Sequence, residues 1–145
     1  MRNYWKATYL ADVSEACRDI LIEQANKAPT PGCVVALEHM LGGAVAGLDE
    51  DHSAFAARSA TYKRLALGST DDPAQDAAVR DWVRGLWQAV EPFSTGGVYV
   101  NYMSADEADR VGEAFGPNHV RLAKIKRQYD PSNLFRLNQN IAPAA

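Results

Sequence analysis

Apolar positions recur along this chain with two spacings, and each spacing predicts one kind of element. Apolar runs rich in β-branched and aromatic residues predict strands over 4–10, 33–37, 44–48 and 62–67. Apolar residues three and four positions apart predict helices over 13–28, 73–90 and 118–129, with a shorter helix near 111–115. These elements interleave without the strict alternation that builds a parallel sheet. We therefore expect an α+β fold, with an antiparallel sheet covered by helices on one face.

Capping and turn residues mark where several of these elements begin. Asp12–Glu15 reads as a capping pair for the first helix, and Asp72–Gln75 supplies an N-cap, a proline at N1 and a glutamine at N3. Ser104–Glu107 matches the Ser-x-x-Glu capping box before the short helix. Gly42–Gly43 permits a tight reversal, so the strands before and after it are expected to pair with each other antiparallel.

Two of the helices are expected to be amphipathic. In the helix over 73–90, the apolar stripe consists of Val79, Trp82, Val83, Leu86 and Val90. In the last helix, we expect three residues to point inward and four basic residues to point mostly outward, namely Val120, Ala123 and Tyr129 inward, and Arg121, Lys124, Lys126 and Arg127 mostly outward. Both helices should therefore pack through one face.

Composition narrows the class of protein. The 145 residues are 47% hydrophobic, which is enough for one domain with a buried core. The net charge of −3 gives no field that would attract nucleic acid or an anionic membrane. No apolar run approaches the ~20 residues of a membrane span, and we expect a cytoplasmic protein. Cys17 and Cys33 lie outside any redox or metal-ligand spacing and are expected to be small buried hydrophobic residues.

The sequence contains no self-contained nucleotide site or metal site. Gly42–Gly43 and Gly96–Gly97 lack the spacing that places backbone N–H groups around a phosphate. His39, His52 and His119 are scattered over different predicted elements, so no metal site is expected.

Glu38, at the end of an apolar strand and next to His39, is the first candidate for chemistry. A carboxylate buried at this position must be paired, and its desolvation would favour a role as general base or acid. The alternative is that the strand has already ended and that Glu38 points to solvent.

Tyr99–Tyr102, after the double glycine Gly96–Gly97, is the second candidate. In a strand, Tyr99 and Asn101 would share one face and Tyr102 would lie on the other, so that a hydroxyl and an amide could flank a cofactor ring from different sides. The alternative is that both tyrosines belong to an aromatic core.

The carboxyl-terminal tail, with its amide-rich Asn138–Asn140, could by itself be a turn that caps its own backbone. Together with earlier segments, however, it resembles the berberine-bridge-enzyme-like FAD-linked oxidases. The segments that carry this resemblance are Asn3–Lys6, Leu37–His39, Gly42–Val45, Ala54–Phe55 with Arg58 and Tyr62, Pro92–Tyr102, Ala114–Asn118 and Lys124–Ile141.

This resemblance implies the carboxyl-terminal part of such an enzyme. Residues 1–100 would be an incomplete half of the substrate-binding α+β domain, and residues 101–145 would be a segment that contacts FAD, with both parts forming one compact unit. The resemblance also implies roles for five residues, with Glu38 and Tyr102 as catalytic residues and Asn101, Asn138 and Asn140 as FAD contacts.

The expected partners follow from the parts of these oxidases that the 145 residues do not resemble. The FAD-binding domain and the first half of the substrate domain are not found among them, and Ala36 stands where some relatives place a lysine. Because a half sheet exposes an apolar face and an unpaired edge, we expect an FAD-binding domain on another chain or a homo-oligomer. The expected function is the carboxyl-terminal portion of an FAD-dependent oxidoreductase that acts on a C–H bond next to O or N of a small molecule. The alternative is a non-catalytic module that binds a partner or a ligand, or a truncated relic of such an oxidase.

Overall fold

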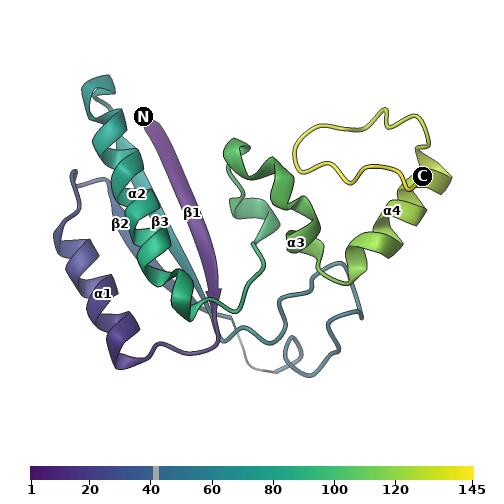
Figure 1. Cartoon of the computed structure of the whole chain (residues 1–145), viewed down its shortest axis with the longest axis horizontal. Helices are drawn as coiled ribbons and strands as arrows, with labels where there is room; N and C mark the ends of the chain where they lie inside the picture. The colour runs from purple at the N-terminus through teal and green to yellow at the C-terminus, as the bar shows by residue number, and fades with distance from the viewer. Residues whose placement is uncertain (41–42) are drawn as a thin grey trace.

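Within residues 1–40 and 43–145, which the computed structural model describes, the chain forms three strands, four helices and four short 3-10 turns (Figure 1). The strands are β1 (Arg2–Leu10), β2 (Val34–His39) and β3 (Tyr62–Thr70). The helices are α1 (Glu15–Asn26), α2 (Asp76–Val90), α3 (Val111–Phe115) and α4 (Asn118–Tyr129). The 3-10 turns are η1 (Pro73–Gln75), η2 (Glu91–Phe93), η3 (Val100–Tyr102) and η4 (Ala105–Arg110).

The three strands form one antiparallel sheet in the order β1-β3-β2. Helices α1 and α2 lie side by side on the same face of this sheet (Figure 1). Between helices and sheet lies the main core, which consists of Leu10, Cys17, Leu21, Ala66, Trp82, Val83, Leu86 and Val90. The predicted fold class, an antiparallel sheet covered by helices on one face, is confirmed.

Helix α2 packs closely on the sheet through its predicted stripe. All five stripe residues are buried, namely Val79, Trp82, Val83, Leu86 and Val90. A Cβ at Gly68 of β3 would lie 2.4 Å from Cγ1 of Val79 and 2.9 Å from Cγ2 of Val83, so glycine allows this close approach. The indole Nε1 of Trp82 donates to the carbonyl of Gln24 at 2.8 Å and joins α2 to α1.

Arg64 of β3 is a buried cation on the helix-covered side of the sheet. Its Nη2 donates to Oγ1 of Thr8 at 2.8 Å, whereas Nε and Nη1 have no hydrogen-bond partner among the described residues. Burial lowers the pKa of Arg64 to about 10, against smaller opposing effects of Cys17 and Glu91. A charge with so few partners in the core costs folding free energy.

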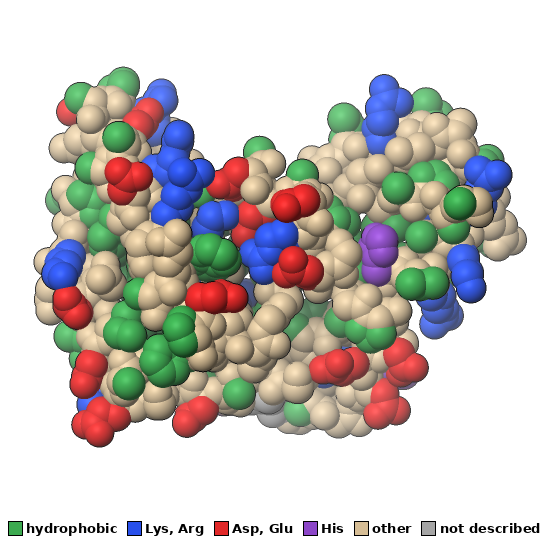
Figure 2. Space-filling model, viewed as in Figure 1, with side chains coloured by type: hydrophobic (Ala, Val, Ile, Leu, Met, Phe, Trp, Pro, Cys, Tyr) green, Lys and Arg blue, Asp and Glu red, His purple; other side chains and the backbone are tan. Residues whose placement is uncertain are grey.

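The rest of the chain packs beside β1 and then extends away from the sheet. A second, smaller core joins Val98, Met103 and Val111, with Ala114, Phe115 and Ile141 against it. Helix α4 and the tail after it lie furthest from the sheet (Figure 1). Figure 2 shows a notch on the upper rim between the sheet with its helices and this outer part. In the part of the chain that is described, no helix is long and apolar enough to cross a membrane.

The strand predicted over 44–48 does not form. Residues 44–47 are turn, and Val45 and Leu48 are 39% and 40% exposed. The strand that does pair antiparallel with β2 is β3, which lies further along the chain. The reversal predicted at Gly42–Gly43 includes Gly42, which lies outside the described residues.

Two other local predictions were wrong, one about the N-cap of α1 and one about the inward stripe of α4. Helix α1 begins at Glu15 and is capped by Ser14, whose hydroxyl accepts from the backbone N–H of Cys17 at 3.3 Å, rather than by Asp12. In α4, Val120 and Tyr129 were expected to point inward but are 63% and 78% exposed, whereas the side chain of Lys126, expected outward, is 16% exposed and pairs with Asp130. The predicted inward stripe of α4 is therefore largely exposed.

The other local predictions hold in most respects. Cys17 is fully buried and Cys33 half-buried, and both are free thiols. The carboxylate of Asp72 accepts from the backbone N–H of Ala74 at 2.9 Å, which confirms the predicted N-cap before α2.

Candidate functional site

The face of the sheet that α1 and α2 leave free carries the candidate site. Residues of β2 and β3 alternate between the two faces, and Val35, Tyr62 and Ala66 point toward the helices. Glu38 and Lys63 stand opposite each other in the β2–β3 pairing. Each lies an odd number of residues from the helix-facing residues of its strand, so both side chains point to the free face. The sheet thus presents a carboxylate and an ammonium side by side on that face.

Lys63 is the residue that the sequence reasoning missed. Its Nζ lies 2.9 Å from Oε2 of Glu38, and its side chain is 7% exposed whereas that of Glu38 is 40% exposed. His39, the neighbour of Glu38 in sequence, lies on the other face and packs edge-on against Tyr62 at 5.3 Å between ring centroids. The strand continues through Glu38, so the carboxylate is paired rather than free in solvent.

The η3 turn brings two tyrosines over this ion pair. The Tyr102 hydroxyl donates to Oε1 of Glu38 at 3.3 Å, and Nζ of Lys63 lies 4.2 Å and 4.4 Å from the ring centroids of Tyr99 and Tyr102. The two tyrosine rings pack edge to face, with centroids 5.1 Å apart and an interplanar angle of 82°. Among the predicted site residues, the structure therefore brings Glu38 and Tyr102 into direct contact.

The arrangement of Tyr99 and Tyr102 corrects the expectation of a strand. Val100–Tyr102 is a 3-10 turn, closed by a hydrogen bond from the N–H of Tyr102 to the carbonyl of Tyr99 at 2.8 Å. The tyrosines consequently meet on the same side instead of flanking a cofactor from opposite faces. The 3-10 turn has about three residues per turn, whereas the predicted strand would have placed successive side chains on alternate faces.

The segment that carries these tyrosines is fastened to β1 at both ends. The N–H of Thr95 donates to the carbonyl of Tyr9 at 3.0 Å, and the Ser104 hydroxyl donates to the carbonyl of Trp5 at 2.8 Å. Gly96 and Gly97 between these contacts have φ of 79° and 73°, a conformation that favours glycine. The predicted Ser104–Glu107 capping box is also present. The sequence thus fixes the η3 turn against the sheet.

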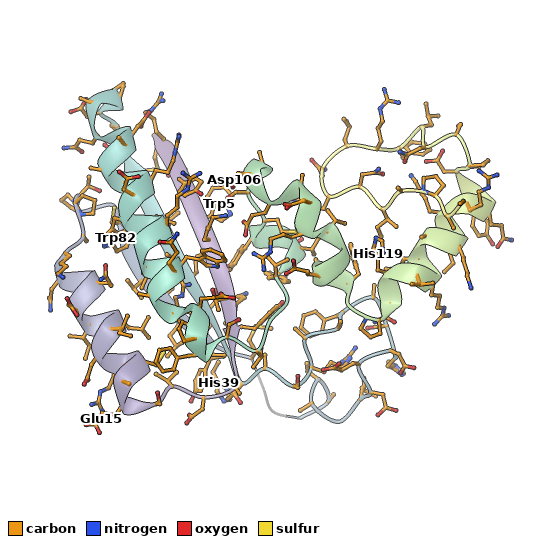
Figure 3. The ribbon with its side chains drawn as sticks, viewed as in Figure 1. Trp5, Glu15, His39, Trp82, Asp106 and His119 are labelled. Carbon is orange, nitrogen blue, oxygen red and sulfur yellow. The ribbon has the colours of Figure 1, made fainter. Side chains whose placement is uncertain are left out.

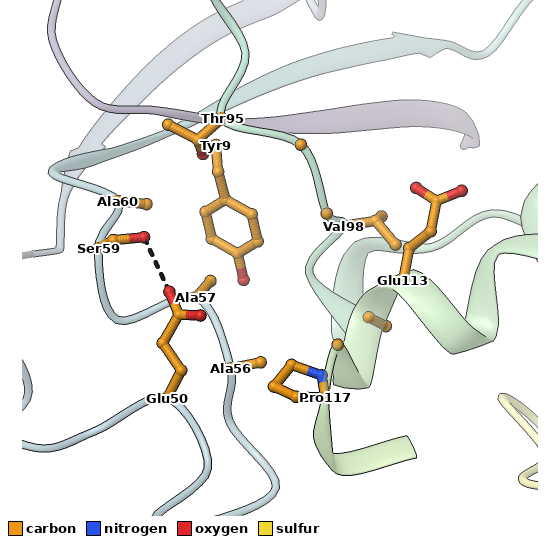
Figure 4. Close-up of a pocket in the computed structure, with 14 residues that line it drawn as sticks. Tyr9, Glu50, Ala56, Ala57, Ser59, Ala60, Thr95, Val98, Glu113 and Pro117 are labelled. Carbon is orange, nitrogen blue, oxygen red and sulfur yellow. Dashed lines mark hydrogen bonds between the residues drawn. The ribbon is translucent and has the colours of Figure 1, made fainter. Parts of the chain in front are cut away.

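Tyr9 lies opposite Lys63 in register and lines a neighbouring cavity. Figure 4 shows its ring pointing into a pocket of about 230 Å³ that the loop around Ala57 and the segment around Val98 enclose. Burial, with a smaller contribution from Tyr99, raises the pKa of Tyr9 well above its ordinary value. The Tyr9 hydroxyl therefore stays protonated at neutral pH. The residues that line this pocket do not include Glu38 or Lys63, so the pocket is separate from the candidate site.

The three predicted cofactor contacts differ in their surroundings. The amide Nδ2 of Asn101 donates to the Tyr99 hydroxyl at 2.9 Å, so Asn101 belongs to the candidate site. Asn138 is exposed with φ of 60°, and its carbonyl accepts from the N–H of Asn140 at 3.0 Å. Oδ1 of Asn140 is buried without a hydrogen-bond partner among the described residues.

The amide-rich tail returns toward the η3 turn. Nε2 of Gln139 donates to the carbonyl of Met103 at 3.3 Å, directly after Tyr102 in the chain. Asp130 organises the turn that precedes this return, since its carboxylate accepts from the backbone N–H groups of Leu134 and Phe135 at 2.8 Å and 3.0 Å. The tail and the candidate site are thus neighbours.

Metal ligands do not gather around this site. Across residues 1–40 and 43–145, no group of three or more His, Cys, Asp and Glu side chains comes close enough to hold a metal ion. Figure 3 shows His39 at the lower end of the sheet and His119 on α4, well apart.

The antiparallel sheet with helices on one face is a fold that this chain shares with flavin oxidases of known structure. Residues 98–142 match the family model described as berberine and berberine like. The solved structure of a glycopeptide hexose oxidase complexed with teicoplanin superposes with a TM-score of 0.82 and 26% identity, over 97% of this chain and 32% of that one.

Curated relatives agree with this class. An FAD-linked oxidoreductase of Dictyostelium discoideum is 26% identical over 125 residues, which cover 86% of this chain and 27% of the relative. An uncharacterized FAD-linked oxidoreductase of Bacillus subtilis is 31% identical over 106 residues, which cover 73% of this chain and 23% of the relative. The chain thus spans about a quarter of the length of these relatives. It belongs to the berberine-bridge-enzyme-like FAD-linked oxidoreductases and corresponds to a carboxyl-terminal part of such a protein.

Proposed function

We propose that this chain forms the substrate-facing wall of an FAD-linked oxidoreductase that oxidises a C–H bond next to a hydroxyl or amine of a small molecule. The observation that carries the proposal is the hydrogen bond from Tyr102 to Glu38 on the free face of the sheet. Both groups can exchange protons, and Lys63 gives the carboxylate a fixed partner. A proton acceptor held on an open face is what a bound substrate requires from this side.

The division of chemistry between cofactor and chain is simple. FAD, when bound, accepts a hydride from the substrate carbon. Glu38 and Tyr102 hold and move the proton that leaves the substrate oxygen or nitrogen, and the edge-to-face packing of Tyr99 on Tyr102 fixes the orientation of the ring. The name of the hexose oxidase relative supports a sugar or other hydroxyl compound as the substrate class.

The residues of this chain fit a flavin at one edge of the site. The buried Oδ1 of Asn140 lacks a donor among the described residues, and a ring N–H is the kind of donor that would satisfy it. Asn101 and Asn138 are exposed and offer further amide groups. We propose that these three asparagines contact FAD, whose main binding domain lies outside residues 1–145.

The surface that would meet this FAD-binding domain is apolar. Tyr129, Leu134, Phe135 and Leu137 are 78%, 69%, 78% and 86% exposed. Exposed apolar side chains gathered on one segment favour burial against another surface. We propose that this surface is covered by the FAD-binding domain, on another chain, or by a second copy of this chain.

Visible absorbance tests the cofactor part of the proposal. The purified chain is incubated with FAD, passed through gel filtration and examined for a retained flavin band. A retained band would mean that copies of this chain build a flavin site themselves, whereas a colourless chain would direct the search to an FAD-binding partner.

Two substitutions then test the catalytic part in the flavin-loaded enzyme. We expect Tyr102→Phe and Glu38→Gln each to lower turnover by about 100-fold or more, the usual contribution of a general base. Lys124→Met, on the exposed side of α4, serves as a matched control. Unchanged turnover in both site variants would refute the assignment.

A further inference from the structure

The pocket of about 230 Å³ into which Tyr9 points takes no part in the chemistry proposed for the free face of the sheet. Small residues leave this space between the loop before β3 and the segments around Val98 and α3, namely Ala56, Ala57, Ala60, Gly96, Gly97 and Gly116. An engineered cavity of about 150 Å³ admits benzene, so this pocket has room for a ligand of roughly six non-hydrogen atoms or more. Glu50 and Ser59 on its wall are exposed, so a ligand can enter from solvent.

Tyr9 supplies a hydrogen-bond donor inside this pocket. The residue is only 2% exposed, and Figure 4 shows its hydroxyl pointing into the space that the pocket encloses. Burial raises the pKa of this hydroxyl, and no hydrogen bond to another described residue offsets the loss of water. Buried polar groups normally have a hydrogen-bond partner. The Tyr9 hydroxyl is therefore available to donate to a ligand.

Glu50 supplies a negatively charged acceptor in the same pocket. Oγ of Ser59 donates to Oε1 of Glu50 at 3.0 Å (Figure 4), and Nδ2 of Asn118 donates to the backbone carbonyl of Glu50 at 2.8 Å. These two hydrogen bonds hold the side chain and the backbone of Glu50 in place. The described lining residues include no lysine or arginine, and the other lining carboxylate, Glu113, is paired with Arg110 at 2.8 Å. Glu50 thus offers a charge that a cationic ligand can meet.

We infer that this pocket binds a small primary ammonium ion that also carries a hydroxyl, with the ammonium on Glu50 and the ligand hydroxyl accepting from Tyr9. An ammonium has three donors and no acceptor, which suits a carboxylate, whereas a hydroxyl oxygen can accept from a phenol. An anionic ligand is disfavoured, because the described lining residues offer it no lysine or arginine. The site is independent of the proposed oxidase function, because neither Tyr9 nor Glu50 is placed in that reaction.

Serinol and glycerol are matched probes for this site, since serinol is glycerol with an ammonium in place of the central hydroxyl. In the intact protein, tyrosine labelled with carbon-13 at Cζ reports on the Tyr9 hydroxyl by NMR, and the spectrum of Tyr9→Phe identifies its signal. We expect serinol to shift this signal saturably in the millimolar range and to bind at least about tenfold more tightly than glycerol. The absence of a shift with serinol, or equal affinities of the two probes, would overturn the inference.

Two variants separate binding in the pocket from general attraction of cations. Glu50→Gln should weaken the binding of serinol about tenfold and that of glycerol by less than about threefold, because only serinol carries a charge. Asp51→Asn removes the same charge from an exposed neighbour that does not line the pocket and should leave both affinities unchanged. If the two variants behave alike, serinol is held by the general negative charge of the loop and the inference is wrong.

Tyr9→Phe tests the second contact by isothermal titration calorimetry. The variant should weaken the binding of serinol by about threefold to tenfold, because a neutral hydrogen bond contributes less than one to a charged group. An unchanged affinity would show that the ligand hydroxyl does not meet Tyr9 and would overturn the inference. Should Tyr9→Phe fail to fold, calorimetry with Glu50→Gln and Asp51→Asn decides, since both alter exposed side chains.

Discussion

The sheet with α1 and α2 and the segment from α4 to the carboxyl terminus bury their apolar residues very differently. In the first region, Leu10, Leu86 and Val90 are 0% exposed. In the second, Phe135 and Leu137 are 78% and 86% exposed although they are just as apolar. The first region therefore obtains its stability from its own core, whereas the second presents a surface that another protein surface can bury.

The same contrast separates stability from function. The helix-covered face of the sheet is built around apolar packing, whereas its free face and the tail carry the charged and amide groups of the candidate site. A core substitution can therefore lower the stability of the fold without changing any side chain of the site, and a site substitution can leave the packing of the main core intact.

The largest expected effect comes from removing core volume. Leu86→Ala should lower the free energy of unfolding of the chain by about 2–5 kcal/mol, because a buried side chain is truncated to leave a cavity. Leu137→Ala, the matched change in the tail, should alter it by less than about 0.5 kcal/mol. Urea unfolding of both variants measures the two changes in the free energy of unfolding. Equal losses would show that the two regions do not differ in how much their apolar residues stabilise the chain.

A smaller effect is expected where α2 meets β3. Gly68→Ala should destabilise the fold by about 1–3 kcal/mol, because its Cβ would lie 2.4 Å from Cγ1 of Val79. Gly85→Ala, in α2, places its Cβ in open space and should stabilise the fold by about 0.5–1 kcal/mol. Thermal unfolding should show shifts of opposite sign, and a neutral Gly68→Ala would disprove the tight contact.

The smallest effect is a local loosening of the tail at acid pH. The hydrogen bond from Lys126, helped by the backbone N–H groups of Leu134 and Phe135, lowers the pKa of Asp130. Because the folded pKa lies below the unfolded value, the turn is stabilised above the ordinary aspartate pKa and loses this stability as pH falls through the folded pKa.

Hydrogen exchange measures that loosening. The protection factors of the Leu134 and Phe135 amides should fall at acid pH, while that of Leu86 in the core stays high. Asp130→Asn should remove the pH dependence, and if it persists in this variant, Asp130 does not control the turn.

Local patterns were enough to predict the helix-covered region. The α2 stripe of Val79, Trp82, Val83, Leu86 and Val90 was correct because helical periodicity is contained within one segment. The strand over 44–48 was wrong, because residues 44–47 form a turn and β2 pairs with the distant β3 instead. The residues of one segment do not determine which distant segment it will pair with.

The candidate site was predicted only in part for the same reason. Glu38 and Tyr102 were candidates from their positions in the sequence, the family resemblance implied catalytic roles for them, and the structure brings them into contact. Lys63 was missed, since it stands opposite Glu38 only after β3 pairs with β2. The signal was a lysine near the start of β3, and its meaning depends on the register of β3 with β2.

Lys63 and Arg64 give β3 two consecutive buried cations, one on each face of the sheet. Only the first lies in the candidate site, whereas the second occupies the core with one hydrogen bond and serves no group of the proposed reaction. Arg64 is therefore the natural position for engineering this protein. An apolar replacement there offers a sturdier scaffold for crystallisation and for flavin reconstitution, while every group proposed to meet substrate stays as it is.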